Sequence, residues 1–218
     1  MRSVDALPAV VSPQLLLEEL LVEFSEDVFS PPEVIEEVKF QVQVDVQGSS
    51  NGPWVLTMDL GDYSVETGTT AAPFIAVQGS EEHWNMTWGL WVKDLVAEIN
   101  KAGGPEDFIE MVQNEVEKRG HKKVILNDDI LEALEKHPTV FLCQVTDFQG
   151  QDLSMKVGLY TSDLSQEPRF TLTMNGATFE EFRQRNLDPV KAWKAKRVQL
   201  QGDLVHATKL ARTLGQAS

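Results

Sequence analysis

Residue types that could carry out chemistry are few in this chain, and their spacing is not that of a catalytic or metal site. The four histidines are His83, His121, His137 and His206. They lack HExxH spacing and a paired cysteine, so surface histidines are a better interpretation than a zinc site. Asp128 and Asp129 could form an acid and base pair, but adjacent acids before an apolar run favour a helix N-terminus, where the dipole stabilises them. We predict no catalytic residue, metal or cofactor, and a protein that is not an enzyme.

The single cysteine and the glycine-containing turns suggest no chemistry either. Cys143 is the only cysteine, which excludes a disulfide within the chain. It stands in an alternating apolar stretch, so a small core residue is a better interpretation than a catalytic thiol. The Gly-Pro turns at 52–53 and 104–105 belong to neither GxGxxG nor GxxxxGK[ST], so no nucleotide-binding loop is predicted.

Alternating apolar residues predict strands in both halves of the chain. In the first half they are Phe40, Val42, Val44 and Val46, then Trp54, Leu56, Met58 and Leu60, then Ile75 and Val77. In the second half they are Phe141, Cys143 and Val145, then Leu153, Met155, Val157 and Leu159, then Phe170 and Leu172. Short turns separate the strands of the first half, which predicts an antiparallel meander there.

Helices are predicted around these strands. Ser12 and Pro13 start an amphipathic helix that runs to Phe24. A helix after Ser80 carries Trp84, Trp88 and Trp91 and stops at Gly103, and another follows over 105–120. The three tryptophans either roof an apolar ligand cavity or fill a large core, and large aromatics more often fill cores.

The order of strands and helices recurs, which predicts a domain duplication. We expect an α+β fold of two domains, each a mostly antiparallel sheet covered by helices. Domain one is residues 1–137, with a helical insertion at about 92–120, and domain two is residues 138–218. Coincidence is the alternative, because any two α+β domains contain alternating strands.

The two halves differ in charge. Residues 1–137 contain 26 acidic and 9 basic residues, whereas residues 138–218 contain 8 and 10. An acidic first half argues against nucleic acid binding. The basic residues of 183–212 could contact a membrane surface or an acidic partner, or they could form a solvated face towards the acidic domain. No apolar run is long enough for a signal or a membrane span, so we expect a cytoplasmic protein.

The second half resembles the sterol carrier protein type 2 domain. The matching residues over 140–214 are Phe179, Phe182, Leu187, Pro189, Ala192, Trp193, Gly202, Asp203, Ala207 and Leu210. Arg185 departs from the family, which commonly has glycine there and so a different helix end. The first half matches more loosely, at Ser80–Trp84, Gly89 and 127–129.

The resemblance implies tandem domains with a tunnel that binds a fatty acid, acyl-CoA, sterol or phospholipid. The residues expected to line it are Met155, Val157, Phe170, Leu172, Phe179, Phe182, Trp193, Leu200, Leu204 and Leu210, with Trp84, Trp88 and Trp91 in the first copy. Non-enzymatic lipid binding or transfer is the expected function. The alternatives are an interaction or accessory protein whose cavities are filled by side chains, and the lipid-binding part of an enzyme complex of lipid or isoprenoid metabolism.

Overall fold

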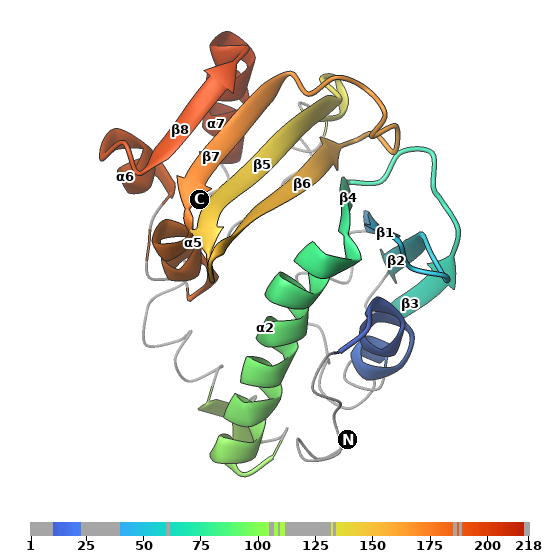
Figure 1. The fold of residues 1–218 in the computed structure, drawn as a ribbon. Helices are drawn as coiled ribbons and strands as arrows, with labels where there is room; N and C mark the ends of the chain where they lie inside the picture. The colour runs from blue at the N-terminus through green and yellow to red at the C-terminus, as the bar shows by residue number, and fades with distance from the viewer. Residues whose placement is uncertain are drawn as a thin grey trace. The chain divides into compact units, whose positions relative to one another are not determined.

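The chain forms two compact units. The computed structural model describes residues 11–22, 40–59, 62–104, 107–108, 110–111, 132, 134–184, 187 and 189–215, and Figure 1 labels their elements. Unit 1 consists of Met1–Thr70 and Ser80–Lys123, and unit 2 of Ala71–Gly79 and Val124–Ser218. This division differs from the expected one after residue 137, because Ala71–Gly79 belongs to unit 2. That 1–137 and 138–218 fold as separate domains stays a prediction.

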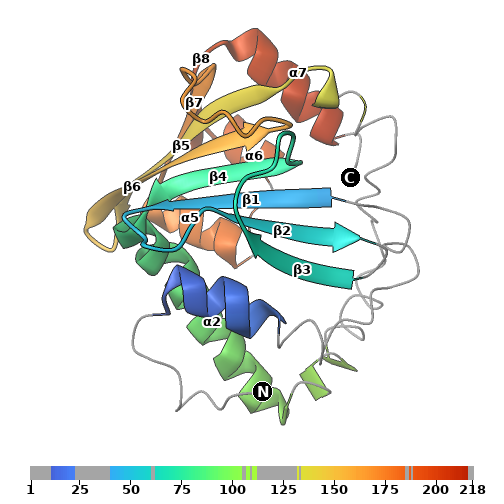
Figure 2. The same cartoon turned by 90° about the vertical axis from the view of Figure 1, so that its right-hand side faces the viewer.

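Unit 1 contains a three-stranded antiparallel sheet. Its strands are β1 (Phe40–Gln47), β2 (Trp54–Asp59) and β3 (Asp62–Thr67), with β2 in the middle (Figure 2). Val44 pairs with Trp54, and Leu56 pairs with Val42 and Val65. Paired residues point to the same face, so the predicted alternation does place the apolar side chains of β1 and β2 together.

The third strand of this meander is not the predicted one. We expected it at Ile75 and Val77, but β3 is the next strand after β2 in the chain and pairs with β2. Its alternation of Tyr63 and Val65 with polar residues is too short to stand out from a turn. The predicted strand exists as β4 (Ile75–Ser80), and it pairs with a strand of unit 2.

Two helices of unit 1 begin where the sequence predicts. The Ser12 hydroxyl accepts a hydrogen bond from the Leu15 amide (3.1 Å) at the helix that contains η2 (Leu15–Leu20). At α2 (Glu81–Ala102), the Ser80 hydroxyl accepts from the His83 amide (3.1 Å). Gly103 ends α2 with φ of 109°, which favours glycine.

Parts of the expected helical insertion and of the first repeat cannot be compared with the structure. Most of the expected helix over 105–120 lies outside the described residues. Asp128 and Asp129, which we expected at a helix N-terminus, lie outside them entirely, as does His121.

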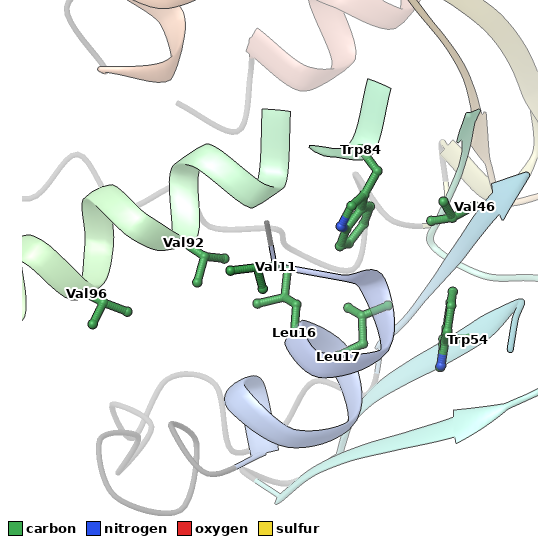
Figure 3. Packing of buried hydrophobic residues seen from close by; sticks show 8 residues of the cluster. All are labelled: Val11, Leu16, Leu17, Val46, Trp54, Trp84, Val92 and Val96. Carbon is green, nitrogen blue, oxygen red and sulfur yellow. The ribbon is translucent and has the colours of Figure 1, made fainter. Parts of the chain in front are cut away.

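The core of unit 1 forms where η2, α2 and the sheet meet (Figure 3). Its buried residues are Val11, Leu16, Leu17, Val46, Trp54, Trp84, Val92 and Val96. Trp54 is completely buried, and its indole nitrogen donates to Glu18 Oε1 at 2.7 Å. The polar edge of this indole is therefore satisfied while its rings fill the core.

Unit 2 contains a mixed sheet in the order β4, β6 (Gln151–Leu159), β5 (Thr139–Phe148), β7 (Phe170–Asn175) and β8 (Val198–Gly202). The β4–β6, β6–β5 and β7–β8 pairs are antiparallel. The expected sheet was mostly antiparallel, but β7 pairs with β5 in parallel. The physical reason is that β6 already ends beside Thr139, where β5 begins, and the link at 160–169 carries the chain across that end of β5 to its other edge.

Unit 2 also contains the helices α5 (Gly176–Arg183), α6 (Pro189–Lys194) and α7 (Leu204–Gly215). Two residues of the resemblance, Gly202 and Asp203, have local structural roles at the start of α7. Gly202 has φ of 108°, and a Cβ there would lie 2.7 Å from the Arg169 carbonyl oxygen. Asp203 Oδ1 accepts from the His206 amide (2.9 Å), which caps the helix. Among the described residues, no helix is both long and apolar enough to cross a membrane.

Candidate functional site

Strand register gathers the apolar residues of unit 2 on one face of its sheet. Cys143 pairs with Met155 on one side and with Leu172 on the other. Leu172 in turn pairs with Leu200, so one row of apolar side chains crosses four strands. The neighbouring row consists of Val157, Phe141 and Phe170. We call these two rows the apolar face.

The apolar face is half-buried at its centre and closed at both ends of β5. Cys143, Met155, Leu172 and Leu200 are all partly accessible. At one end of β5, Thr139 is 1 % exposed and contacts His206 of α7. At the other end, the Phe148 ring meets the Phe179 ring of α5 edge-on at 5.3 Å. The accessible apolar stretch therefore lies between two anchored helices.

The opposite face of the same sheet is polar. Gln144, the next residue of β5 after Cys143, belongs to a polar row across four strands. This row consists of Ser154, Gln144, Thr173 and Gln199. On the same opposite face, near the start of β5, Leu164 packs on Ala76 and Val140. Burying the polar row against a hydrocarbon would leave hydroxyl and amide groups without partners, which is unfavourable. Only the apolar face suits a hydrophobic ligand.

The groups on the apolar face are chemically inert. Burial raises the pKa of the Cys143 thiol to about 11, so the thiol stays protonated at neutral pH and is a poor nucleophile. The Phe141 and Phe170 rings stack at 5.0 Å. Within the described part of the chain, no group of three or more His, Cys, Asp or Glu residues is arranged to hold a metal ion. The arrangement favours binding by contact with hydrocarbon.

The structure brings together some of the predicted lining residues. Met155, Val157, Phe170, Leu172 and Leu200 lie on the apolar face. Sequence reasoning did not include Phe141 and Cys143 among them, although their alternation within a predicted strand was the available signal.

The remaining predicted lining residues lie on helices. Phe179 and Phe182 are half-buried on α5, and Leu210 of α7 packs with Leu134. Trp193 and Leu204 are 46 % and 52 % exposed, so they do not pack with the buried and half-buried lining residues. Their part in ligand binding stays a prediction.

The three tryptophans of α2 belong to unit 1. Trp84 is buried in the core cluster and stacks on Trp88 at 6.0 Å. Trp88 is 42 % exposed, and Trp91 packs partly buried against the cluster. This placement favours the interpretation of Trp84 as a core residue.

The basic residues of 183–212 are divided among several elements. Arg183 is paired with Glu180 (2.6 Å) and Arg197 with Glu181 (2.7 Å). The others that the structure describes lie on α6 or just after it, and on α7; these two helices lie at opposite ends of β8 (Figure 1). Their contact with a membrane or a partner protein stays a prediction.

A hydrogen-bond network joins α7 to the start of β5. The Thr139 hydroxyl donates to the His137 carbonyl oxygen (2.7 Å), so its single proton is used there. His206 Nε2, at 2.6 Å, therefore donates to Thr139 Oγ1, and Nδ1 accepts from the Arg169 guanidinium (3.3 Å). This network requires a neutral imidazole.

The network predicts a pH dependence of stability. Desolvation, with the nearby charge of Arg169, lowers the pKa of His206, so the unfolded chain binds this proton more readily than the folded one. The contribution of neutral His206 to stability is complete above its unfolded pKa of about 6.5. This contribution is lost as the pH falls towards and through the lower pKa of His206 in the folded chain. Urea midpoints at pH 8 and pH 5 measure the loss. We expect a smaller loss in His206→Gln, and equal losses would contradict this role.

Comparisons with known proteins identify the kind of domain. Residues 122–215 match the model of the SCP-2 sterol transfer family. The match covers less than half of the chain and does not reach residues 1–121, where a first copy was expected. The findings support one such domain in the C-terminal part of the chain, within a structure of mixed helices and sheet. They give no evidence of a tandem copy in the N-terminal part. A comparison with curated proteins finds no matching sequence.

Several solved structures share limited similarity with the chain. Sterol carrier protein 2 from Yarrowia lipolytica is 13 % identical, with 41 % of this chain and 77 % of that chain covered and a TM-score of 0.30. Sterol carrier protein domain 2 of Helicoverpa armigera is 19 % identical, with 42 % of this chain and 76 % of that chain covered and a TM-score of 0.31. Palmitated SCP2L2 from Aedes aegypti is 18 % identical, with 39 % of this chain and 90 % of that chain covered and a TM-score of 0.27.

Proposed function

We propose that unit 2 binds the hydrocarbon part of a lipid on its apolar face and carries the lipid without chemical change. The observation that carries this proposal is the row formed by Met155, Cys143, Leu172 and Leu200, which is apolar and only half-buried. The match of residues 122–215 to a sterol transfer family supports the same function. We assign binding to unit 2 alone, because Trp84 and its neighbours fill the core of unit 1.

Hydrocarbon burial is sufficient to drive such binding. Each methylene group removed from water contributes about 0.8 kcal/mol, so a long acyl chain needs no specific polar contact. Fatty acids, acyl-CoA, sterols and phospholipids all present hydrocarbon that the apolar face could contact. The proposal therefore predicts affinity that follows chain length.

A series of neutral alcohols tests this prediction. We expect each two-carbon extension from dodecanol to tetradecanol to hexadecanol to tighten binding about 15-fold, from about 1.6 kcal/mol of added burial. Displacement of a fluorescent fatty acid probe, below the solubility limit of each alcohol, measures the series. Failure of the probe to bind, together with purified protein that carries no lipid in native mass spectrometry, would overturn the proposal.

A further inference from the structure

A cationic cluster lies at the Thr139 end of the apolar face. It consists of Arg169, His206, Lys209 and His137, which we call the basic cluster. Arg169 contacts His206 Nδ1 at 3.3 Å, and Lys209 Nζ contacts His137 Nε2 at 2.9 Å. Thr139 joins the two halves, because its hydroxyl contacts both His206 and the His137 carbonyl group.

The cations of the basic cluster hydrogen-bond to imidazoles. Within the part of the chain that the structure describes, neither Arg169 nor Lys209 forms an ion pair. The acidic charge that acts on His206 is that of Asp203, whose Oδ1 already accepts from the backbone at the start of α7. Two permanent positive charges thus face one acid, which leaves the cluster with net positive charge.

The fold holds this cluster in place. The Arg169 amide donates to the Val140 carbonyl oxygen (2.8 Å), and the Arg169 carbonyl oxygen accepts from the Asp203 amide (2.9 Å). Gly202 allows this close approach, because any Cβ there would collide with the Arg169 backbone. The backbone of Arg169 is therefore fixed between β5 and α7, although its side chain is exposed.

The basic cluster is also next to the apolar face in the sequence and in the sheet. Phe170 follows Arg169 directly, and its ring stacks on Phe141 of the apolar face. Thr139 stands two residues before Phe141, so both side chains point to the same face of β5. A hydrocarbon tail on the apolar face would bring a polar group at its end towards Arg169 and His206.

We propose that the basic cluster binds the anionic head group, a carboxylate or a phosphate, of an amphiphilic lipid whose tail lies on the apolar face. This inference rests on the proposed function of unit 2. An anion accepts charge-assisted hydrogen bonds from Arg169 and Lys209 that are stronger than those to a neutral imidazole. The planar guanidinium of Arg169 suits two oxygens of one head group. The ligand of unit 2 is then an anionic amphiphile and not a neutral sterol.

The test compares hexadecanoic acid with hexadecanol, which differ only at the head group. We expect the unaltered protein to prefer the acid about tenfold, from charge-assisted hydrogen bonds. Arg169→Gln and Lys209→Gln should each reduce this preference, and the double variant should abolish it, while the affinity for hexadecanol stays the same. Lys194→Gln, which removes an exposed cation from α6, is the matched control and should keep the preference.

The outcomes separate this inference from the proposed function. A full preference for the acid in the double variant would overturn the head-group site and leave lipid binding intact. Failure of both ligands to bind any form of the protein would overturn lipid binding itself. Titration with inorganic phosphate distinguishes a free anion from a lipid head group. Phosphate binding that depends on Arg169 and Lys209, without a preference for the acid over the alcohol, would assign the cluster to a free anion and overturn the proposal.

Discussion

Leu172→Lys is expected to weaken lipid binding by more than about 100-fold. Leu172 stands in the middle of the apolar row, between Cys143 and Leu200. A charge placed there without a partner would lose its hydration when the lipid covers it, at a cost of several kcal/mol. A factor of ten in affinity corresponds to about 1.4 kcal/mol. Displacement of a fluorescent fatty acid probe measures the loss.

Thr173→Lys is the matched control for this variant. Thr173 is the next residue of β7 and is also half-buried, but it belongs to the polar row with Gln144 and Gln199. Its replacement introduces the same charge into the same strand on the opposite face. We expect near-normal binding, provided that circular dichroism shows both variants folded. Equal loss in the two variants would show that binding does not depend on which face is changed.

Trp54→Ala is expected to destabilise unit 1 by about 3–5 kcal/mol, the usual range for removing a fully buried large aromatic side chain. Trp54 has no exposed surface and packs in the cluster with Leu17 and Val46. The variant also leaves Glu18 without its indole donor. The shift of the urea midpoint, followed by circular dichroism and converted with the measured slope, gives the change in the free energy of unfolding.

Trp88→Ala supplies the comparison for this prediction. Trp88 lies in the same unit but is 42 % exposed, and its main contacts are the Trp84 and Trp91 rings. Aromatic pairs of this kind contribute about 0.5–1.5 kcal/mol each, so we expect a loss of about 1–3 kcal/mol from the two pairs. A Trp88→Ala loss as large as that of Trp54→Ala would mean that burial does not determine the contribution of these tryptophans.

Local chemistry was predictable wherever neighbouring residues determine the structure. The helix starts at Ser80 and Asp203 follow from side chains that accept hydrogen bonds from amides in the first turn. The helix end at Gly103 and the conformation of Gly202 follow from the freedom of glycine at positive φ. The alternation in β5 and β6 likewise indicated which residues share a face.

Strand pairing was less predictable, because it joins residues that are distant in the sequence. The sequence shows that Ile75 and Val77 form a strand, but not that this strand pairs with β6. It shows an apolar strand at Phe170, but not that this strand runs parallel to β5. The resemblance over 140–214 agrees with the family match over 122–215, whereas the first copy found no support.

The sequence by itself determined which faces of the strands are apolar and where helices begin and end, because these properties depend on residue type and short spacing. Only the tertiary structure decided that Cys143, Met155, Leu172 and Leu200 form one row, and that Arg169, His206 and Lys209 meet at its end. It also decided that Trp193 and Leu204 are exposed. Register and helix docking set these neighbours, and both depend on contacts between segments that no local pattern specifies.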